Sequence, residues 1–448
     1  MKTRGWWRPT SLFVCLVTIA SARGQPTGPS SADEAPTTEV PAEALNDAPG
    51  YTPDEGSSEG PLRITGYIDV GFAKAQGNGT SFRSGDTRIP ADYGVDTFAP
   101  AVNSRGDVAS LDSGGRYLNG FLPDTVNIGG RASFLINTVD IDIRYAPQSL
   151  PVFVFARTQL LPRFGSGGND TRLVVEQAFG RISPFSSVEF ALSLGKFDSV
   201  FGIEYLDNQA NIRTGITPSL IARYTTGQSI GAKVFYRMQI PSLWSAVSLN
   251  IAATNSGPWV QTLQTPNISL TGLPNLAGRL GYELNLARFQ LKLGGSGWLG
   301  PRNDQHDSHV GQHALGADAR VAAGWVSASV EYVNLREDQG TQPGKFSGTG
   351  TYEFASGFHV YGYYGQLAVA LPVRARALQT VTVYARYDRR HAEFEGFGAI
   401  TTSRVTTGMR LELWSTFALK AEYLFNRELD GAPTVANDVF TSSAVFTW

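Results

Sequence analysis

The chain has 448 residues, of which 42% are hydrophobic, 11% are aromatic and only 17% are charged. Ordinary soluble domains carry roughly 25% charged residues, so this composition is poor in charge for a soluble protein. The formal net charge of −2 provides no overall positive field, and we therefore predict no nucleic-acid partner.

Residues 1–22 are predicted to be a signal peptide. Basic residues precede the apolar run 11–20, and the small residues Ala20-Ser21-Ala22 follow it as a cleavage site. The apolar run is too short to cross a bilayer, which takes about 20 residues. The only cysteine, Cys15, lies in this segment, so we expect an exported mature protein without disulfides.

Residues 23–61 are rich in proline, serine and acidic residues. A segment of this composition cannot bury an apolar core. We predict that it is a disordered periplasmic linker ahead of a single domain that covers 62–448.

The body of the chain shows a period of two. In 62–72, 186–197 and 415–427, apolar and polar residues alternate over ten or more positions. A soluble strand averages about five or six residues, whereas a tilted strand needs about 9–11 residues to cross hydrocarbon. This pattern predicts an all-β fold, a transmembrane antiparallel β-barrel with an apolar outside and a polar inside.

The alternating segments predict about sixteen strands. The expected strands are 62–72, 128–145, 151–161, 171–182, 186–197, 228–239, 243–254, 275–286, 288–298, 313–322, 324–335, 356–371, 378–390, 401–413, 415–427 and 436–448. The segment 128–145 changes parity near Asn137-Thr138, so it contains either a bulge or two merged elements.

The connections alternate in length. Short turns alternate with long segments such as 73–127, 198–227, 255–274, 299–312 and 336–355. Short periplasmic turns and long extracellular loops are typical of outer-membrane barrels. A soluble β-sandwich is the alternative, but its strands are shorter and need no polar inner face.

The chain ends in a strand with aromatic residues at Phe440, Phe446 and Trp448. A barrel must pair its last strand with its first, because an open sheet edge is not tolerated in lipid. Phe446 and Trp448 also resemble the signal that the outer-membrane barrel-assembly machinery reads, so we predict this machinery as a partner.

One stretch resembles a known family. The segment 192–215, followed by 217–238, is similar to the OmpL-like family of β-barrel porins, which is distantly related to phosphate-selective porins. The matching residues are Gly195, Lys196, Phe197, Phe201, Gly202, Glu204, Asp207, Asn211, Pro218, Thr226 and Gly227. Ser199-Val200 departs from the expected Thr-Pro. The resemblance implies a diffusion porin of the bacterial outer membrane, which can be a homotrimer, with 198–227 folded inward.

The residues of 198–227 support this interpretation. The segment carries polar groups of both signs, and such groups at a neck would sort solutes by size and charge. The predicted constriction residues are Asp198, Glu204, Asp207, Asn211, Arg213 and Arg223. An ordinary surface loop is the alternative, in which these charges only keep the segment hydrated.

Strand parity also predicts which charges face inward. The predicted pore-lining residues are Arg157, Glu189, Lys233, Arg237, Arg279, Lys292, Arg404 and Arg410. The same parity turns inward Arg63, Arg131, Arg144, Arg288, Arg320, Arg386, Lys420, Asp69, Asp140, Asp142, Glu176, Glu283, Asp318, Glu331, Asp388, Glu412 and Glu422. Basic residues exceed acidic ones only slightly, so we expect at most a weak anion preference and no phosphate selectivity.

The histidines suggest little chemistry. His306, His309 and His313 are weak metal candidates in a predicted outer loop, and we expect neither a metal nor another cofactor. A barrel hydrolase would need a partner for His359 or His391, and no Ser-His-Asp pattern stands out. We therefore predict a porin that is not an enzyme. A surface-structural or adhesive barrel with an occluded lumen stays the alternative.

Overall fold

The computed structural model describes residues 61–75, 133–147, 149–165, 168–185, 187–198, 200–255, 273–301, 311–338, 358–373, 375–394, 398–430 and 438–448. The predicted signal peptide 1–22 and the predicted linker 23–61, except for Pro61, lie outside these residues. No helix among them is long and apolar enough to cross a membrane.

The predicted strands are confirmed within a few residues at each end. They are β1 (Leu62–Ala75), β2 (Ser133–Tyr145), β3 (Val152–Gly165), β4 (Gly168–Ile182), β5 (Glu189–Asp198), β6 (Gln228–Ile240), β7 (Ser245–Thr254), β8 (Asn275–Leu286), β9 (Phe289–Pro301), β10 (Gly311–Ala323), β11 (Val326–Glu337), β12 (Phe358–Pro372), β13 (Leu378–Phe394), β14 (Gly398–Leu413), β15 (Phe417–Glu428) and β16 (Val439–Thr447).

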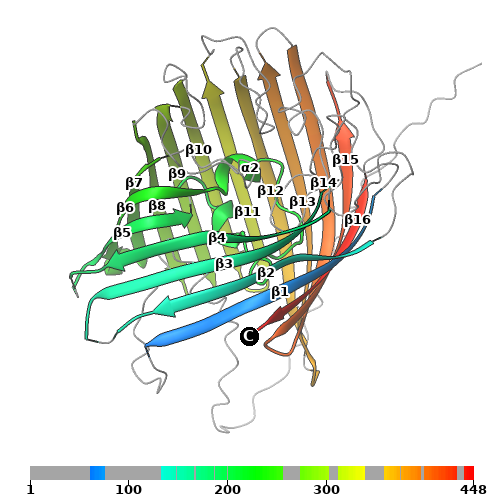
Figure 1. Ribbon diagram of the computed structural model, residues 1–448, viewed down its shortest axis with the longest axis horizontal. Coiled ribbons are helices and arrows are strands. Elements are labelled where there is room, and N and C mark those ends of the chain that lie inside the picture. Colours follow the sequence, from blue (N-terminus) through cyan, green and yellow to red (C-terminus); the bar gives the residue numbers. More distant parts are fainter. Residues whose placement is uncertain are drawn as a thin grey trace, which may run out of the picture. The chain divides into compact units, whose positions relative to one another are not determined.

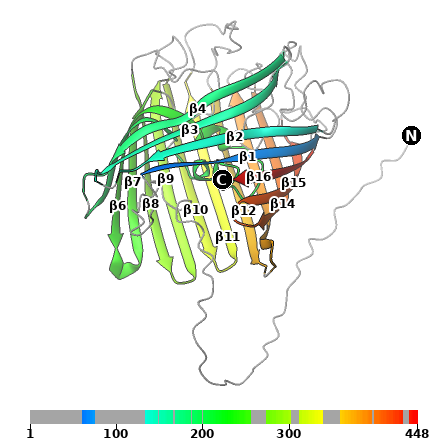
Figure 2. The same ribbon diagram turned by 60° about the horizontal axis from the view of Figure 1, so that its bottom comes forward.

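The strands form a closed antiparallel barrel. Each strand pairs with its neighbours in sequence, and β1 pairs with β16 from Tyr67↔Thr447 to Ala75↔Val439. Figure 2 shows β1 between β2 and β16, where the ring closes. Closure leaves no open sheet edge, as a hydrocarbon environment requires.

The two faces of the wall differ in polarity. On β16, Phe440 and Phe446 point outward and are 41% and 48% exposed, whereas Thr441 and Ser443 point inward and are buried. The same alternation runs around the barrel, with buried polar residues on the inner side. An apolar outer face and a polar interior are the arrangement that a transmembrane barrel needs.

The connections differ between the two ends. At the end where Leu62 and Thr447 lie, all connections are short: 146–151, 183–188, 241–244, 287–288, 324–325, 373–377 and 414–416. At the opposite end they include 76–132, 199–227, 255–274 and 338–357. Two connections at that end are only 166–167 and 395–397, because β3, β4, β13 and β14 extend further than their sequence pattern indicates.

The change of parity in β2 is a β-bulge. Thr138 pairs with Asp69 and Ile136 pairs with Val70, so Asn137 is the extra residue. Its side chain donates a hydrogen bond to Asp69 at 3.2 Å. A second bulge, at Glu176 of β4, was not predicted, because one extra residue hardly disturbs the apolar pattern there.

Candidate functional site: the inward loop

The connection 199–227 between β5 and β6 lies inside the barrel, where it forms the short helices η3 (Glu204–Asp207) and α2 (Ala222–Thr225) (Figure 1). Phe201, Ile221 and Tyr224 are each 0% exposed. Such apolar residues are buried only if the segment packs against the wall. We name residues 199–227 the inward loop.

A glycine permits the loop to turn away from β5. Gly202 has a φ of +75°, and a Cβ added there would lie 1.9 Å from the Glu331 carboxylate. Only glycine combines this left-handed conformation with so close an approach. The Gly202 N–H donates to the Ser296 hydroxyl on β9 at 3.0 Å.

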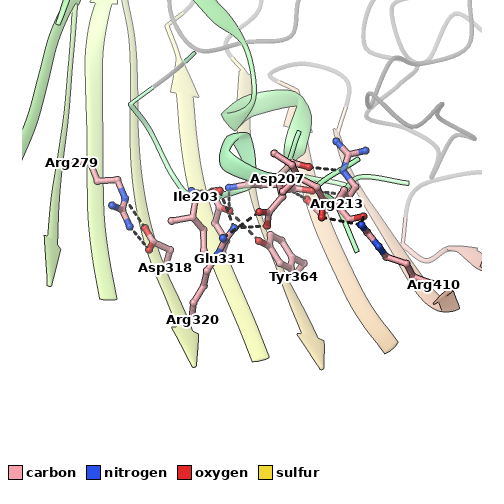
Figure 3. Close-up of polar contacts among 12 residues, drawn as sticks. Ile203, Asp207, Arg213, Arg279, Asp318, Arg320, Glu331, Tyr364 and Arg410 are labelled. Carbon is pink, nitrogen blue, oxygen red and sulfur yellow. Dashed lines mark hydrogen bonds and ion pairs between the residues drawn. The ribbon is translucent and has the colours of Figure 1, made fainter. Parts of the chain in front are cut away.

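Carboxylates of the wall hold the loop backbone by accepting hydrogen bonds from its N–H groups. Hydrogen bonds to ionised groups are stronger than neutral ones. Glu331 accepts from the N–H groups of Ile203 and Glu204 at 3.3 and 3.1 Å. Glu422 accepts from those of Ile216 and Thr217 at 2.6 and 2.9 Å, and Asp388 accepts from that of Leu220 at 3.3 Å. The contact at Glu331 is visible in Figure 3.

Cations of the wall hold the loop by donating to its carbonyl groups. Arg386 donates to Thr217 and Pro218 at 2.8 Å each, and Arg404 donates to Pro218 at 3.3 Å. Arg410 donates to Asn211, Ile212 and Arg213 at 2.8, 3.1 and 2.8 Å, and Lys420 donates to Ala210, Arg213 and Gly215 at 2.5, 2.6 and 3.0 Å. Arg320 and Arg390 add bonds to Ile203 at 3.1 Å and to Leu220 at 3.5 Å. Both signs of wall charge therefore anchor one main chain.

The loop also binds itself. The Glu204 carboxylate accepts hydrogen bonds from the N–H of Ser219 at 2.7 Å and from the Ser219 hydroxyl. Burial raises the pKa of Glu204 above its ordinary value, although Arg386 and Ser219 oppose this shift. Arg213 donates to the carbonyl groups of Asp207 and Ile216 at 3.0 Å each. The loop is thus one connected unit.

The predicted constriction residues that the structure describes all make anchoring or pairing contacts. Asp207 pairs with Arg320 at 2.6 Å, Asp198 accepts from Gln177 at 2.7 Å, and Glu204 and Arg213 serve the interior of the loop. The Asn211 carbonyl accepts from Arg410. The side chain of Arg223 lies outside what the structure describes. The role of these residues in solute passage stays a prediction.

The predicted pore-lining residues point inward and are paired. Arg157 pairs with Asp142 at 2.6 Å, Arg279 pairs with Asp318 at 2.6 Å, and Lys292 pairs with Glu283 at 3.0 Å. Arg237 pairs with Glu189 at 3.2 Å and with Glu283 at 2.7 Å. Lys233 lies 5.0 Å from the centre of the Phe197 ring, and Arg404 and Arg410 bind the inward loop.

A recess separates the loop from the wall at β7–β10. Its lining includes Ile203, Leu206, Arg279, Glu283, Lys292 and Arg320. Figure 3 shows Arg279 with Asp318, and Arg320 beside Ile203 of the loop. Apolar loop residues thus face charged wall residues across this recess.

The residues that carry the family resemblance have structural roles. Gly195 has a φ of +134°, and a Cβ there would lie 2.2 Å from the Ala178 carbonyl. Lys196 donates to the Val175 carbonyl at 2.8 Å, beside the bulge at Glu176. Phe197 packs in the apolar cluster that includes Val200 at the start of the loop.

The structure brings no metal ligands together in the parts of the chain that it describes. His306 and His309 lie outside those parts, and His313 is exposed on β10. His359 and His391 face outward, where they contact Asn334 at 3.2 Å and Thr401 at 2.8 Å. His359 also lies 3.6 Å from the Glu393 carboxylate.

A closed barrel of sixteen strands with one long connection packed into its lumen has the fold of outer-membrane porins. The chain is similar to OmpF of Salmonella typhi, solved with daunomycin, at 12% identity over 86% of this chain and 97% of that one, with a TM-score of 0.51. At this identity the likeness shows the fold alone.

Other solved structures are similar at lower scores. The outer-membrane channel DcaP of Acinetobacter baumannii shares 10% identity over 86% of this chain and 97% of that one, with a TM-score of 0.49. The anion-selective porin of Comamonas acidovorans shares 9% over 86% and 99%, with a TM-score of 0.49. No family model and no curated protein match the chain, so membership of the OmpL-like family stays a prediction.

Proposed function

We propose that the protein is a passive diffusion pore of a bacterial outer membrane for small polar or charged solutes. The inward loop narrows the water-filled barrel, and no reaction is catalysed. The observation that carries this proposal is the anchoring of the loop backbone by Glu331, Asp388 and Glu422 and by cations of β13–β15. A segment held so firmly across the lumen sets the size of solute that passes.

Mixed charges at the recess between the loop and the wall support a pore of low selectivity. Arg279, Lys292 and Arg320 are balanced there by Asp318, Glu283 and Asp207. We infer at most a weak anion preference. Export by the signal peptide, assembly through Phe446 and Trp448, and a homotrimeric state belong to the same proposal and rest on sequence.

A second candidate is a surface-structural or adhesive barrel with an occluded lumen. The complete burial of Phe201, Ile221 and Tyr224 favours it, because these side chains fill space that water would otherwise occupy. This candidate differs from the first in one property: the barrel would carry no current while the loop is in place.

Planar-bilayer conductance separates the two candidates. Asp198 pairs with Gln228 across the β5–β6 ladder, so a four-residue Gly-Ser turn can replace residues 199–227 without straining the strands. A pore conducts in the wild type and conducts more after the replacement. An occluded barrel is silent in the wild type and conducts only after it. An outward substitution, Val330→Ala, serves as the control that leaves both currents unchanged.

A further inference from the structure

The β4 bulge turns Arg181 into the lumen. Glu176 is the extra residue of the β3–β4 ladder, and both it and its neighbour Gln177 are buried on the inner side. After this shift Phe179 and Arg181 face inward and are 7% and 5% exposed, whereas Ile182 faces outward and is 44% exposed. Without the extra residue the strand would point Arg181 at lipid, because a shift of one residue exchanges the two faces. The bulge therefore decides that this charge faces the lumen.

The Arg181 guanidinium has an aromatic neighbour and no carboxylate partner among the residues that the structure describes. Its Cζ lies 4.6 Å from the centre of the Phe153 ring, which occupies the opposite position on β3. Within the same residues, no hydrogen bond or ion pair joins this side chain to another group. A cation–π contact offsets only part of the free energy lost when a charge leaves water. A buried arginine in this state indicates a place for an anion.

Two other arginines on the same part of the wall also lie over a ring, but they have an acid beside them. Arg157 donates to Asp142 at 2.6 and 2.7 Å, and Arg144 lies 3.7 Å from the same carboxylate. Their Cζ atoms lie 5.3 and 5.7 Å from the centre of the Phe155 ring. The arrangement of guanidinium over ring thus occurs three times on β2–β4, and of these three cations Arg181 is the one whose charge is not offset.

Arg181 belongs to a row of inward side chains that crosses β3–β6. Phe153 pairs with Arg181, Arg181 pairs with Ser193, and Ser193 pairs with Lys233. We name these four residues the arginine row. Strands lie about 4.8 Å apart, so the Ser193 hydroxyl is between the two cations. Phe179 packs against Phe153 at 6.2 Å between ring centroids, so aromatic rings adjoin the positive charge.

We propose that the arginine row binds an organic carboxylate with an apolar body during its passage through the barrel. The carboxylate accepts parallel hydrogen bonds from Arg181, as guanidinium geometry favours, and one more from Ser193. The apolar body packs against Phe153 and Phe179. An inorganic anion would gain nothing from these rings, so an organic anion is the occupant that fits both parts. The inference rests on the proposed function, because it names a class of solute for that pore.

Calorimetric titration of the full-length barrel in detergent tests the proposal, with detergent alone as the blank. The probes are benzoate, benzyl alcohol with the same ring and no charge, acetate with the same charge and no ring, and sulfate. We expect benzoate to bind about tenfold more tightly than each of the others, which lose either charge-assisted hydrogen bonds or apolar contact. Equal binding of benzyl alcohol, acetate or sulfate would overturn the proposal.

Variants assign the binding to the arginine row. Arg181→Gln is expected to bind benzoate about tenfold more weakly, and Arg181→Lys, which keeps the charge without the fork, should fall between the two. Ser193→Ala is a smaller change and should weaken benzoate about threefold or more. Arg144→Gln is the matched control, since Asp142 already offsets that charge, and its affinity should stay within about twofold. Wild-type affinity in Arg181→Gln, or in Ser193→Ala where Arg181→Gln does not assemble, would overturn the proposal.

Conductance of the same preparations keeps this test apart from that of the pore. Normal current without a preference for benzoate contradicts the arginine row alone. Arg181 lies one residue before the end of β4 at the short connection 183–188, so a barrel that the inward loop occludes can still bind benzoate there. Binding without current therefore contradicts the pore and supports the site. In a conducting pore, benzoate should reduce the single-channel current of the wild type more than that of Arg181→Gln, and a wild-type current that benzoate leaves unchanged would overturn the proposal.

Discussion

The Glu422 carboxylate on β15 accepts a 2.6 Å hydrogen bond from the backbone N–H of Ile216, which lies 206 positions earlier in the chain. The neighbouring N–H of Thr217 donates to the same carboxylate at 2.9 Å. This contact joins the middle of the inward loop to the wall opposite β5 and β6, from which the loop starts.

Replacing this carboxylate is expected to free the middle of the loop. Each hydrogen bond to a charged group contributes about 1.5–3 kcal/mol, and unpaired N–H groups add a further penalty. Glu422→Ala should therefore give noisier single-channel currents and a lower unfolding midpoint. Glu422→Gln keeps one acceptor oxygen, so its current noise and unfolding midpoint should fall between those of the wild type and of Glu422→Ala. Identical current noise in all three proteins would contradict the anchoring role.

Gly195 is expected to tolerate no side chain. Its φ of +134° and the Ala178 carbonyl 2.2 Å from an added Cβ should make Gly195→Ala destabilising by about 1–3 kcal/mol. Urea unfolding followed by tryptophan fluorescence measures this loss. Gly180→Ala is the control, since a Cβ there meets nothing within 4 Å, and its effect should stay within about 0.5 kcal/mol.

Lys292 is expected to influence ion selectivity at the recess between the loop and the wall. One unit charge at about 5 Å in water contributes about 0.8 kcal/mol, or about fourfold in local ion concentration. Lys292→Glu should therefore shift the reversal potential in a salt gradient toward cations. Arg336→Glu changes the same charge on the outer face and should shift it little. Equal shifts in both would place the selectivity outside the recess.

Glu204 should make stability depend on pH. Burial raises its pKa in the folded protein, so the folded state holds this proton more tightly than the unfolded state, whose ordinary pKa is about 4.3. The contribution of Glu204 to stability is then fully present below that value and is lost as pH rises through the folded pKa.

The variant Glu204→Gln removes this titration. The unfolding midpoint of the wild type relative to the variant should fall as pH rises from about 4 toward neutral. Titrations common to both proteins cancel in this difference. A constant difference across the range, or one that grows with pH in favour of the wild type, would contradict the raised pKa.

Trp448 is expected to matter for closing the barrel. Its N–H donates to the Gly66 carbonyl at 3.0 Å, and its carbonyl accepts from the Gly66 N–H at 3.1 Å. Deleting Trp448 removes this last pair of the β1–β16 ladder together with the terminal aromatic. The fraction of heat-modifiable barrel in isolated outer membranes should fall. Trp414→Ala, an exposed aromatic in a turn, should assemble normally.

The strand pattern predicts most of the wall because lipid and water impose opposite demands on alternate residues. The segment 275–286 agrees with β8 at both ends, and the parity change at Asn137 is the bulge. The prediction is less accurate at the long-connection ends of β3 and β13, which continue to Gly165 and Phe394. There the apolar alternation that marks the strands fades.

The site is harder to predict than the wall. Parity correctly turns Glu331, Arg410 and Lys420 inward, but it cannot show that they bind the loop backbone. Their partners lie between 127 and 210 positions away, and a backbone N–H or carbonyl leaves no mark in the sequence. The signal that could have found them is the excess of charges of both signs on β10–β15.

The anchoring of the inward loop has a consequence for how such a barrel can change. Wall side chains form hydrogen bonds with the peptide groups of the loop, which every amino acid carries. This anchoring therefore depends little on the identity of the loop side chains. Substitutions on the face toward the recess can then alter which solutes cross while the loop keeps its place. In the pore that we propose, support of the loop and selection of solutes would then be separate tasks, and the second could change without loss of the first.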